Sequence, residues 1–245
     1  MDFKVIDKKF EKFILNIRDY FSDKNAEVLF NKRNVVKVLD YDGSKYVVKS
    51  FKIPHILNRI VYTFFRETKA KKSYINSVRL DKFAPKSIAY IEFKKFGLLY
   101  DSYFISEEFR YDFTIREPLL DSSFQDKEKI FKAFANFTYQ LHKDDVFHKD
   151  YSPGNILIKK VDDGYEFKIV DVNRMVFKTM ELDDRLDNFS QLWAKDSDLE
   201  IIIKEYSKLA NLDSDVAIKK ALKYSQNLKD RKNFKKRLKG KKVVD

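Results

Sequence analysis

Apolar and polar residues follow two different periods along the first half of the chain. Near the N-terminus the apolar residues recur at helical spacing among charged ones and predict an amphipathic helix over residues 7–22; they are Phe10, Ile14, Ile17 and Phe21. Short β-branched or aromatic runs then predict a three-stranded meander at Val28–Phe30, Val35–Leu39 and Tyr46–Phe51. A helical stretch at 53–80 separates this meander from two more strand-like runs, Ser87–Phe93 and Gly97–Glu108.

The second half of the chain has a mostly helical pattern. Its longest amphipathic segment, Asp126–His142, carries an apolar face made of Ile130, Phe131, Phe134, Phe137 and Leu141. A hairpin follows, with strands at Ile156–Lys160 and Phe167–Asp171, and the pattern is helical again from about Asp183. A small sheet followed by a helical part predicts an α+β fold with two lobes, residues 1–108 and 109–245.

Composition supports one folded unit with anionic partners. The chain has 245 residues, 44% of them hydrophobic, which is enough for one sizeable core and excludes a disordered chain. Only 5 Gly and 4 Pro are present, so no flexible linker separates independent domains, and we expect a single domain over residues 1–245. The net charge of +12 favours nucleotides, nucleic acid or an acidic membrane face as partners.

Two classes of protein are disfavoured. The chain has no cysteine, which rules out disulfides and thiolate metal sites. Charged residues stand at the N-terminus where a signal peptide needs an apolar run, and eighteen uninterrupted apolar residues occur nowhere. We therefore expect a protein that is neither secreted nor membrane-spanning.

The segment between the long helix and the hairpin carries the candidate chemistry. Phosphoryl transfer needs cations on the phosphates, oxygen ligands for Mg²⁺ and a base near the acceptor hydroxyl. Asp150, two residues after His148, is the candidate base. Asn155 and Asp171 are the candidate Mg²⁺ ligands, because the hairpin between them is expected to fold back on itself. A capped polar turn is the alternative for this segment, and His148 is expected to brace the loop as a neutral ring.

The first half supplies the candidate nucleotide contacts. Lys49, in the third strand of the meander, is placed to bind the α- and β-phosphates of ATP, although a solvated strand lysine has the same pattern. Glu67 is the only acid in the basic stretch around it and is the candidate partner of Lys49, with a surface ion pair as the alternative. Glu107 and Phe109, with Glu108 between them, are candidates for adenine binding through backbone groups, or else form an ordinary strand end.

These residues resemble those of a known family. The run His-Lys-Asp-Tyr-Ser-Pro-Gly-Asn-Ile-Leu at 148–157 and the segment 169–175 resemble the bacterial lipopolysaccharide core kinases, the Kdo and heptose kinases of the Kdo/WaaP type. The likeness extends over Lys49, the basic stretch 69–74 and the segment 84–90. It implies a bilobal protein-kinase-like fold and ATP- and Mg²⁺-dependent phosphorylation of a sugar hydroxyl in the inner core of lipid A. It also implies Asp150 as catalytic residue, Asn155 and Asp171 as metal ligands and Lys49 as the ATP lysine.

Three departures from protein-kinase patterns refine this resemblance. The loop at 30–34 that would cover the nucleotide has no glycine, so Lys32 or Arg33 is expected to contact the phosphates as a cation. Asp171 is followed by Val172-Asn173, with no room for a long activation loop. Ser152 stands where protein kinases usually carry lysine, which favours a non-protein acceptor by resemblance.

Two surface segments bear on the partner. Residues 221–245 hold ten Lys or Arg against two Asp, and we expect this basic tail to contact an anionic membrane, at the cytoplasmic face of the inner membrane by resemblance; disordered, screened charge is the alternative. Residues 53–65 are more apolar than a connecting helix needs. We expect them to pack in the small lobe, the alternative being insertion into lipid or a grip on an acylated sugar.

Two rival hypotheses stay open at this point. One is a RIO-like or aminoglycoside-type kinase acting on a soluble or RNA-associated target, with nucleic acid as the less favoured partner of the tail. The other is a catalytically weak kinase-fold protein that binds membranes or nucleic acid. The glycine-free loop supports the second rival, and the joint presence of Lys49, Asp150, Asn155 and Asp171 argues against it.

Overall fold

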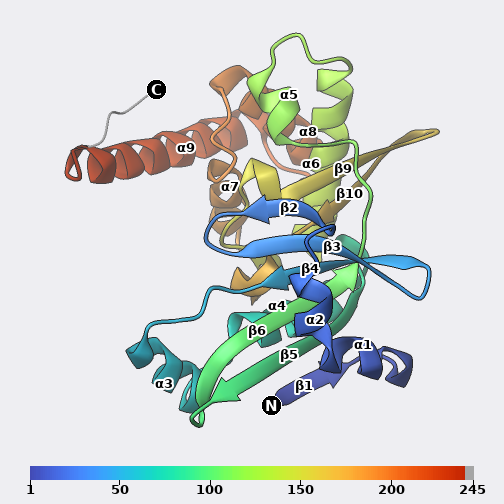
Figure 1. Cartoon of the computed structure of the whole chain (residues 1–245). Coiled ribbons are helices and arrows are strands. Elements are labelled where there is room, and N and C mark those ends of the chain that lie inside the picture. The colour runs from blue at the N-terminus through green and yellow to red at the C-terminus, as the bar shows by residue number, and fades with distance from the viewer. Residues whose placement is uncertain (241–245) are drawn as a thin grey trace. The chain divides into compact units, whose positions relative to one another are not determined.

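The computed structural model describes residues 1–240 and has mixed α/β architecture with antiparallel sheets (Figure 1). The chain divides into two compact units. Unit 1 comprises residues 1–110 with 171–173, and unit 2 comprises residues 111–170 with 174–245. The boundary at residue 110 falls two positions after the predicted one, and the assignment of both units to one kinase-like domain stays a prediction.

Unit 1 is built on a six-stranded antiparallel sheet in the order β1-β5-β6-β4-β3-β2. Its strands are β1 (Asp2–Val5), β2 (Glu27–Asn31), β3 (Val35–Tyr41), β4 (Ser44–Ser50), β5 (Ser87–Lys95) and β6 (Leu98–Glu107). The predicted meander corresponds to β2, β3 and β4, and the next two runs to β5 and β6. The edge strand β1 was not predicted, since four residues are too few for a clear period.

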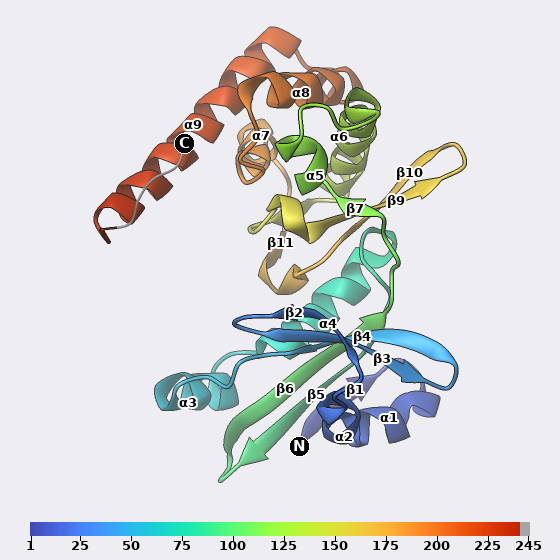
Figure 2. The ribbon, with the colours of Figure 1, turned by 45° about the horizontal axis from the view of Figure 1, so that its top comes forward.

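Helices cover both faces of this sheet, as Figure 2 shows. A short 3₁₀ turn (Lys8–Phe10), α1 (Glu11–Leu15) and α2 (Ile17–Ser22) pack on one face, and α4 (Lys69–Leu80) packs on the other. Successive strand residues point to opposite faces. On β6, Tyr103 and Ile105 therefore join the core under α1 and α2, whereas Phe104 joins the smaller core under α4.

Two helix predictions in unit 1 need correction. The helix predicted for 7–22 is interrupted at Asn16, whose side chain bonds the carbonyl of Lys12 and competes with the helical ladder. The stretch 53–80 forms two helices, α3 (Ile56–Phe64) and α4, instead of one. Moreover, no residue of α3 is buried, so the expectation that 53–65 packs in the small lobe is wrong.

Unit 2 contains the predicted long helix and hairpin. The helix is α6 (Lys127–Lys143), and the hairpin is formed by β9 (Ile156–Val161) and β10 (Gly164–Ile169). The other strands are β7 (Phe113–Thr114), which pairs with β9, and the pair β8 (Val146–His148) and β11 (Met175–Phe177). The other helices are α5 (Arg116–Leu120), α7 (Leu182–Ser190), α8 (Asp196–Ala210) and α9 (Ser214–Arg237).

The basic tail is helical through Arg237, so its charge up to that residue is carried by an ordered element. Lys232 and Lys236 lie 5.3 and 5.5 Å from the centre of the Trp193 ring, and Lys229 bonds the carbonyl of Ala194. Part of the tail's charge therefore serves packing within unit 2. Lys241, Lys242 and Asp245 lie outside the described residues. Within residues 1–240, no helix is long and apolar enough to cross a membrane.

Candidate active site

Successive side chains of β4 point to opposite faces of the sheet, and this alternation directs Lys49 towards its partner. Val48 points into the core under α1 and α2, so Lys49 points to the opposite face, opposite Phe104 of β6. There its Nζ lies 2.8 Å from Oδ1 of Asp171 and over the ring of Phe51. The side chains are 16% and 33% exposed, so the pair is shielded but still open to a ligand.

The segment around Asp171 is held by α4. Asn76 of α4 donates its side-chain N–H to the carbonyl of Val172 at 2.7 Å. Asn173 donates to the same Oδ1 of Asp171 that Lys49 contacts. Asp171 itself has a φ of 57°, a left-handed conformation that Asp tolerates better than most residues. Lys49 and Asn173 use Oδ1, so the other oxygen of the carboxylate, Oδ2, is the one left for a cation.

The candidate catalytic loop in unit 2 is organised by a buried histidine. Nδ1 of His148 accepts the backbone N–H of Asp150 at 3.0 Å, so the proton of the neutral ring is on Nε2, which donates to the carbonyl of Val170 at 3.2 Å. Asn155 donates its side-chain N–H to the carbonyl of Asp150 at 2.9 Å. Both backbone groups of Asp150 are thus fixed by neighbouring side chains, in keeping with the predicted bracing role of His148.

A second layer of buried polar side chains supports this loop. Asn188 of α7 donates to the carbonyl of His148 at 2.9 Å, and its amide oxygen lies 3.1 Å from Nε2 of His142. Nδ1 of His142 lies 3.0 Å from the hydroxyl of Tyr206. Burial lowers the pKa of His142 to about 4 and raises the pKa of Tyr206 to about 12, so both are neutral at pH 7. The loop therefore rests on an uncharged hydrogen-bond network.

The carboxylate of Asp150 faces outward from this framework. Its side chain is 38% exposed, and Oδ2 lies 3.7 Å from the guanidinium of Arg174, which is 66% exposed. An exposed pair at this distance is weak. The carboxylate is therefore accessible to an incoming hydroxyl while its backbone is fixed.

Arg116 is a functional candidate that the sequence did not reveal. A methyl group added at Gly154 would lie 2.5 Å from a terminal nitrogen of Arg116, so this guanidinium lies directly on the loop between Asp150 and Asn155. The Arg116 side chain is exposed, and it makes no ion pair or side-chain hydrogen bond within residues 1–240. The Arg116 guanidinium is therefore a cation beside the loop in which Ser152 stands where protein kinases usually carry lysine. Gly154 was the sequence signal that pointed to such a contact, because a larger residue at this position would clash with a group that lies on the loop.

The predicted partner of Lys49 needs correction. The carboxylate on Lys49 belongs to Asp171, and α4 contains no acid because the helix starts at Lys69 behind its N-cap Thr68. Glu67 therefore lies outside the helix, exposed, on the wall of a separate cavity with Arg66 and Lys71. The buried acid of this region is instead Glu92, whose pKa is raised by burial and whose Oε1 accepts the hydroxyl of Thr68.

The predicted phosphate and adenine contacts occupy defined places in unit 1. Lys32 and Arg33 form the turn between β2 and β3, and both side chains are exposed. The N–H groups of Glu107 and Glu108 donate to the carbonyls of Lys86 and Lys45, so these two donors are not available to a purine. The carbonyl of Glu107 and the backbone of Phe109 remain the predicted adenine contacts.

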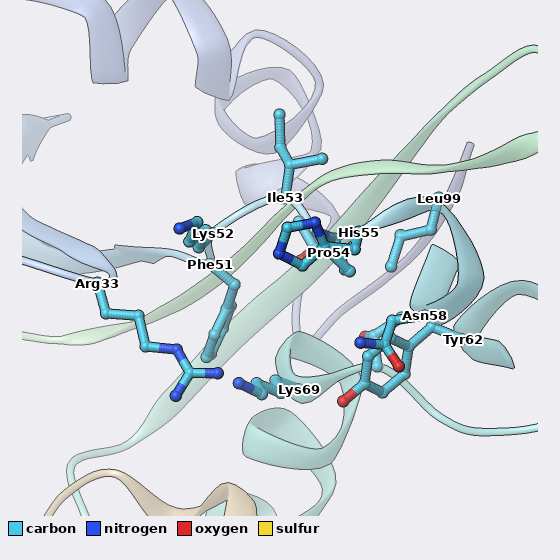
Figure 3. Close-up of a pocket in the computed structure, with 12 residues that line it drawn as sticks. Arg33, Phe51, Lys52, Ile53, Pro54, His55, Asn58, Tyr62, Lys69 and Leu99 are labelled. Atoms are coloured by element: carbon cyan, nitrogen blue, oxygen red, sulfur yellow. The ribbon is translucent and has the colours of Figure 1, made fainter. Parts of the chain in front are cut away.

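A cavity of about 310 Å³ lies in unit 1 beside α3 (Figure 3). Figure 3 shows Arg33, Lys52 and Lys69 on the same side as Phe51, with Asn58 and Tyr62 of α3 on the other. None of the lining residues is a carboxylate. The cavity is therefore suited to an anionic group, and Phe51 connects it to Lys49.

The donor set suits Mg²⁺ more than a transition metal. Residues 1–240 contain no cluster of three or more His, Asp or Glu that could hold a metal ion. Asp171 offers Oδ2, and Asn155, whose N–H₂ bonds Asp150, offers its amide oxygen. Carboxylate and amide oxygens are both ligands that Mg²⁺ accepts, and the joint use of Asp171 and Asn155 stays a prediction.

A family model and a solved structure both relate the chain to lipopolysaccharide kinases. The model of the lipopolysaccharide kinase (Kdo/WaaP) family matches residues 34–211. No curated protein matches the chain. Among solved structures, the chain is similar to WaaP in complex with acyl carrier protein, with 14% identity, a TM-score of 0.61 and coverage of 93% of this chain and 99% of that one. At this identity the structural likeness shows the fold alone.

Proposed function

Because the chain belongs to the lipopolysaccharide kinase (Kdo/WaaP) family, we propose that it transfers the γ-phosphoryl group of ATP to a sugar hydroxyl of the lipopolysaccharide inner core, on Kdo or heptose. The family is one of kinases, and the sugar, the use of ATP and the site residues are our proposal. In it, unit 1 corresponds to the N-lobe of a protein-kinase-like fold and unit 2 to the C-lobe.

One observation carries this proposal: the backbone of Asp150 is held by His148 and Asn155 while its carboxylate stays accessible. A base must lie within hydrogen-bond reach of the proton that it accepts, and a fixed backbone limits where the carboxylate can go. Asp150 accepts the proton of the sugar hydroxyl as the oxygen attacks the γ-phosphorus. The bond from that phosphorus to the β-phosphate oxygen breaks, and ADP leaves with its electron pair.

The remaining candidate residues bind the nucleotide and neutralise the negative charge of its phosphates. Lys49 binds the α- and β-phosphates. Asp171 and Asn155 would hold Mg²⁺, which would supply positive charge to the phosphate oxygens. Arg116 supplies the cation that the loop lacks at Ser152. Lys32 or Arg33 contacts the phosphates from the turn between β2 and β3, and Glu107 and Phe109 bind adenine through backbone groups.

A lipid-anchored substrate also requires the enzyme to work at a membrane. The net charge of +12 and the basic helix α9 support a peripheral position at an anionic surface, which we place at the cytoplasmic face of the inner membrane. Each Lys or Arg near such a surface contributes about 1 kcal/mol.

The decisive experiment measures transfer of a radioactive phosphoryl group from ATP to lipid. Purified protein and γ-³²P-ATP are incubated with lipid A core from a strain lacking the gene, and the label is counted in re-extracted lipid. We expect label with the wild type and its loss with Asp150→Asn, while nucleotide binding is retained. Mass spectrometry of the core oligosaccharide from the deletion strain should show one phosphate fewer and would identify the sugar.

Two results would refute the proposal. Label in RNA-associated protein or in an aminoglycoside, but not in lipid, would favour the soluble-target kinase. Binding of ATP without transfer to any of these acceptors would favour the binding protein without catalytic activity.

A further inference from the structure

Helix α3 is attached to the protein by its polar side. Arg59 donates from Nε to the carbonyl of Leu99 at 2.6 Å, and the hydroxyl of Thr63 accepts the N–H of Leu99 at 2.9 Å. The guanidinium of Arg59 also lies 5.6 Å from the centre of the Tyr100 ring. A surface helix of a globular protein normally buries its apolar side, so the orientation of α3 is reversed.

The opposite side of α3 is apolar and exposed. It carries Ile56, Leu57, Ile60 and Phe64 at helical spacing, flanked by Ile53 and Phe65. Leu57, Phe64 and Phe65 are 75%, 67% and 78% exposed. Single exposed apolar residues are ordinary, but a contiguous set marks a surface that another apolar phase covers. We refer to these six residues as the α3 face.

The turn between β5 and β6 extends this surface. Phe96, at its tip, is 92% exposed, with a φ of 53° followed by Gly97 at 76°, so the tight turn holds the ring outward. Figures 1 and 2 both show this end of the β5–β6 hairpin next to α3. Arg59 of α3 connects the two elements through the carbonyls of Lys95 and Leu99. Aromatic and aliphatic groups thus project from two neighbouring elements.

Cations outnumber carboxylates at the border of this apolar surface, where Asp2, Glu67 and Glu92 also line the cavity beside Phe64 and Phe65. Residues 52–72 contain six Lys or Arg and one acid, Glu67. Lys94 and Lys95 are exposed beside Phe96, and Arg66 is exposed beside Phe65. The adjoining cavity is lined by Arg33, Lys52 and Lys69 with no carboxylate. An apolar centre with a cationic border is complementary to acyl chains beneath anionic headgroups.

We propose that the α3 face and Phe96 insert into an anionic phospholipid bilayer, with headgroups contacting the surrounding cations. Pairing of two copies through this surface would bring two basic borders together and is disfavoured by repulsion. A protein partner would need a matching acidic border around an apolar groove. The proposal deepens the proposed function, on which it rests for the reason that the enzyme needs a membrane, and it assigns the contact to a surface separate from the basic tail.

The absence of cysteine allows insertion to be measured at single positions. Leu57→Cys is labelled with an environment-sensitive fluorophore and titrated with vesicles of phosphatidylcholine alone or with phosphatidylglycerol. Leu120→Cys on α5 is a matched control, because Leu120 is 74% exposed and Leu57 is 75% exposed. We expect a blue-shifted emission and quenching by acyl-chain nitroxides only for the Leu57 label and only with the anionic vesicles.

Co-sedimentation with the same vesicles tests the energetic role of the face. Leu57→Glu with Phe64→Glu should lower the partition coefficient about ten-fold or more, the loss expected when buried apolar side chains return to water. Leu120→Glu should partition like the wild type. Neutralising Lys235, Lys236 and Arg237 with Gln should leave the blue shift of the Leu57 label in place.

Three outcomes would overturn the proposal: equal partitioning of the double variant and the wild type, no blue shift at Leu57, or a concentration-dependent oligomer that the double variant abolishes. The last result would assign the face to a protein interface. These measurements use no ATP, so their failure is distinct from failure of the kinase assay. An active enzyme on detergent-dispersed substrate with no vesicle binding would refute only the membrane inference.

Discussion

Nζ of Lys49 lies 2.8 Å from Oδ1 of Asp171, although 122 positions separate the two residues in the chain. The pair is partly buried, with Phe51 beneath the ammonium. In the absence of ligand, each charge compensates the other. In the proposed function, a nucleotide with Mg²⁺ would replace this pairing, with a negative partner for Lys49 and a positive one for Asp171.

The first prediction concerns Lys49→Met. Because a charge-assisted hydrogen bond contributes about 1.5–3 kcal/mol, we expect the Kd for ATP to rise at least about ten-fold. Isothermal titration calorimetry measures this. Lys45→Met on the same strand is the control and should bind ATP like the wild type. Equal affinity of Lys49→Met and the wild type would remove Lys49 from the nucleotide site.

The second prediction concerns His148, which joins the backbone of Asp150 to that of Val170. His148→Leu leaves the partly buried N–H of Asp150 without its acceptor, so we expect loss of about 1–3 kcal/mol of stability and a lower kcat. The KM for ATP should change little, because His148 is not proposed to touch the nucleotide. His148→Asn, whose amide oxygen can replace Nδ1, should recover part of kcat. A fall in stability with unchanged kcat would give His148 a structural role only.

The third prediction uses the contact between Arg116 and Gly154. Arg116→Ala should reduce kcat/KM about ten- to a hundred-fold if its guanidinium binds a phosphate. Gly154→Ala places a methyl group 2.5 Å from that guanidinium and should displace it, with a smaller loss. The double variant should be no worse than Arg116→Ala, which a double-mutant cycle detects. Additive losses would mean that the two residues act separately.

The fourth prediction concerns pH and His142. Its pKa is about 4 in the folded protein, below its usual 6.5, because burial disfavours the charged ring. The unfolded chain therefore binds the proton first, and stability is lost as the pH falls from 6.5 towards 4. The full loss amounts to about 3 kcal/mol. Urea denaturation at several pH values should show a steeper slope in the wild type than in His142→Gln, because other groups titrate equally in both; an identical slope would refute the assignment.

Sequence by itself determined the parts of the site that lie close together in the chain. His148, Asp150 and Asn155 fall within one loop, and the covalent chain limits their separation, so their spacing already indicated them as candidate site residues. Lys49 was recognised because an apolar run placed it in the third strand of a meander. Local periodicity also predicted β2 to β6, α6 and the β9–β10 hairpin, since each element has its own apolar pattern.

Only the tertiary structure decided which distant groups meet. It gave Lys49 the carboxylate of Asp171 instead of Glu67, because α4 starts after Glu67 and the sheet turns Lys49 towards the 171–173 segment. It also placed Arg116 on Gly154, a contact between elements with no shared pattern. The same holds for α3, whose amphipathic pattern is visible in the sequence but whose outward direction is not. A helical period shows that the two faces of a helix differ in polarity, but it does not show which face packs on the sheet. The hydrogen bonds of Arg59 and Thr63 to Leu99 decide this for α3.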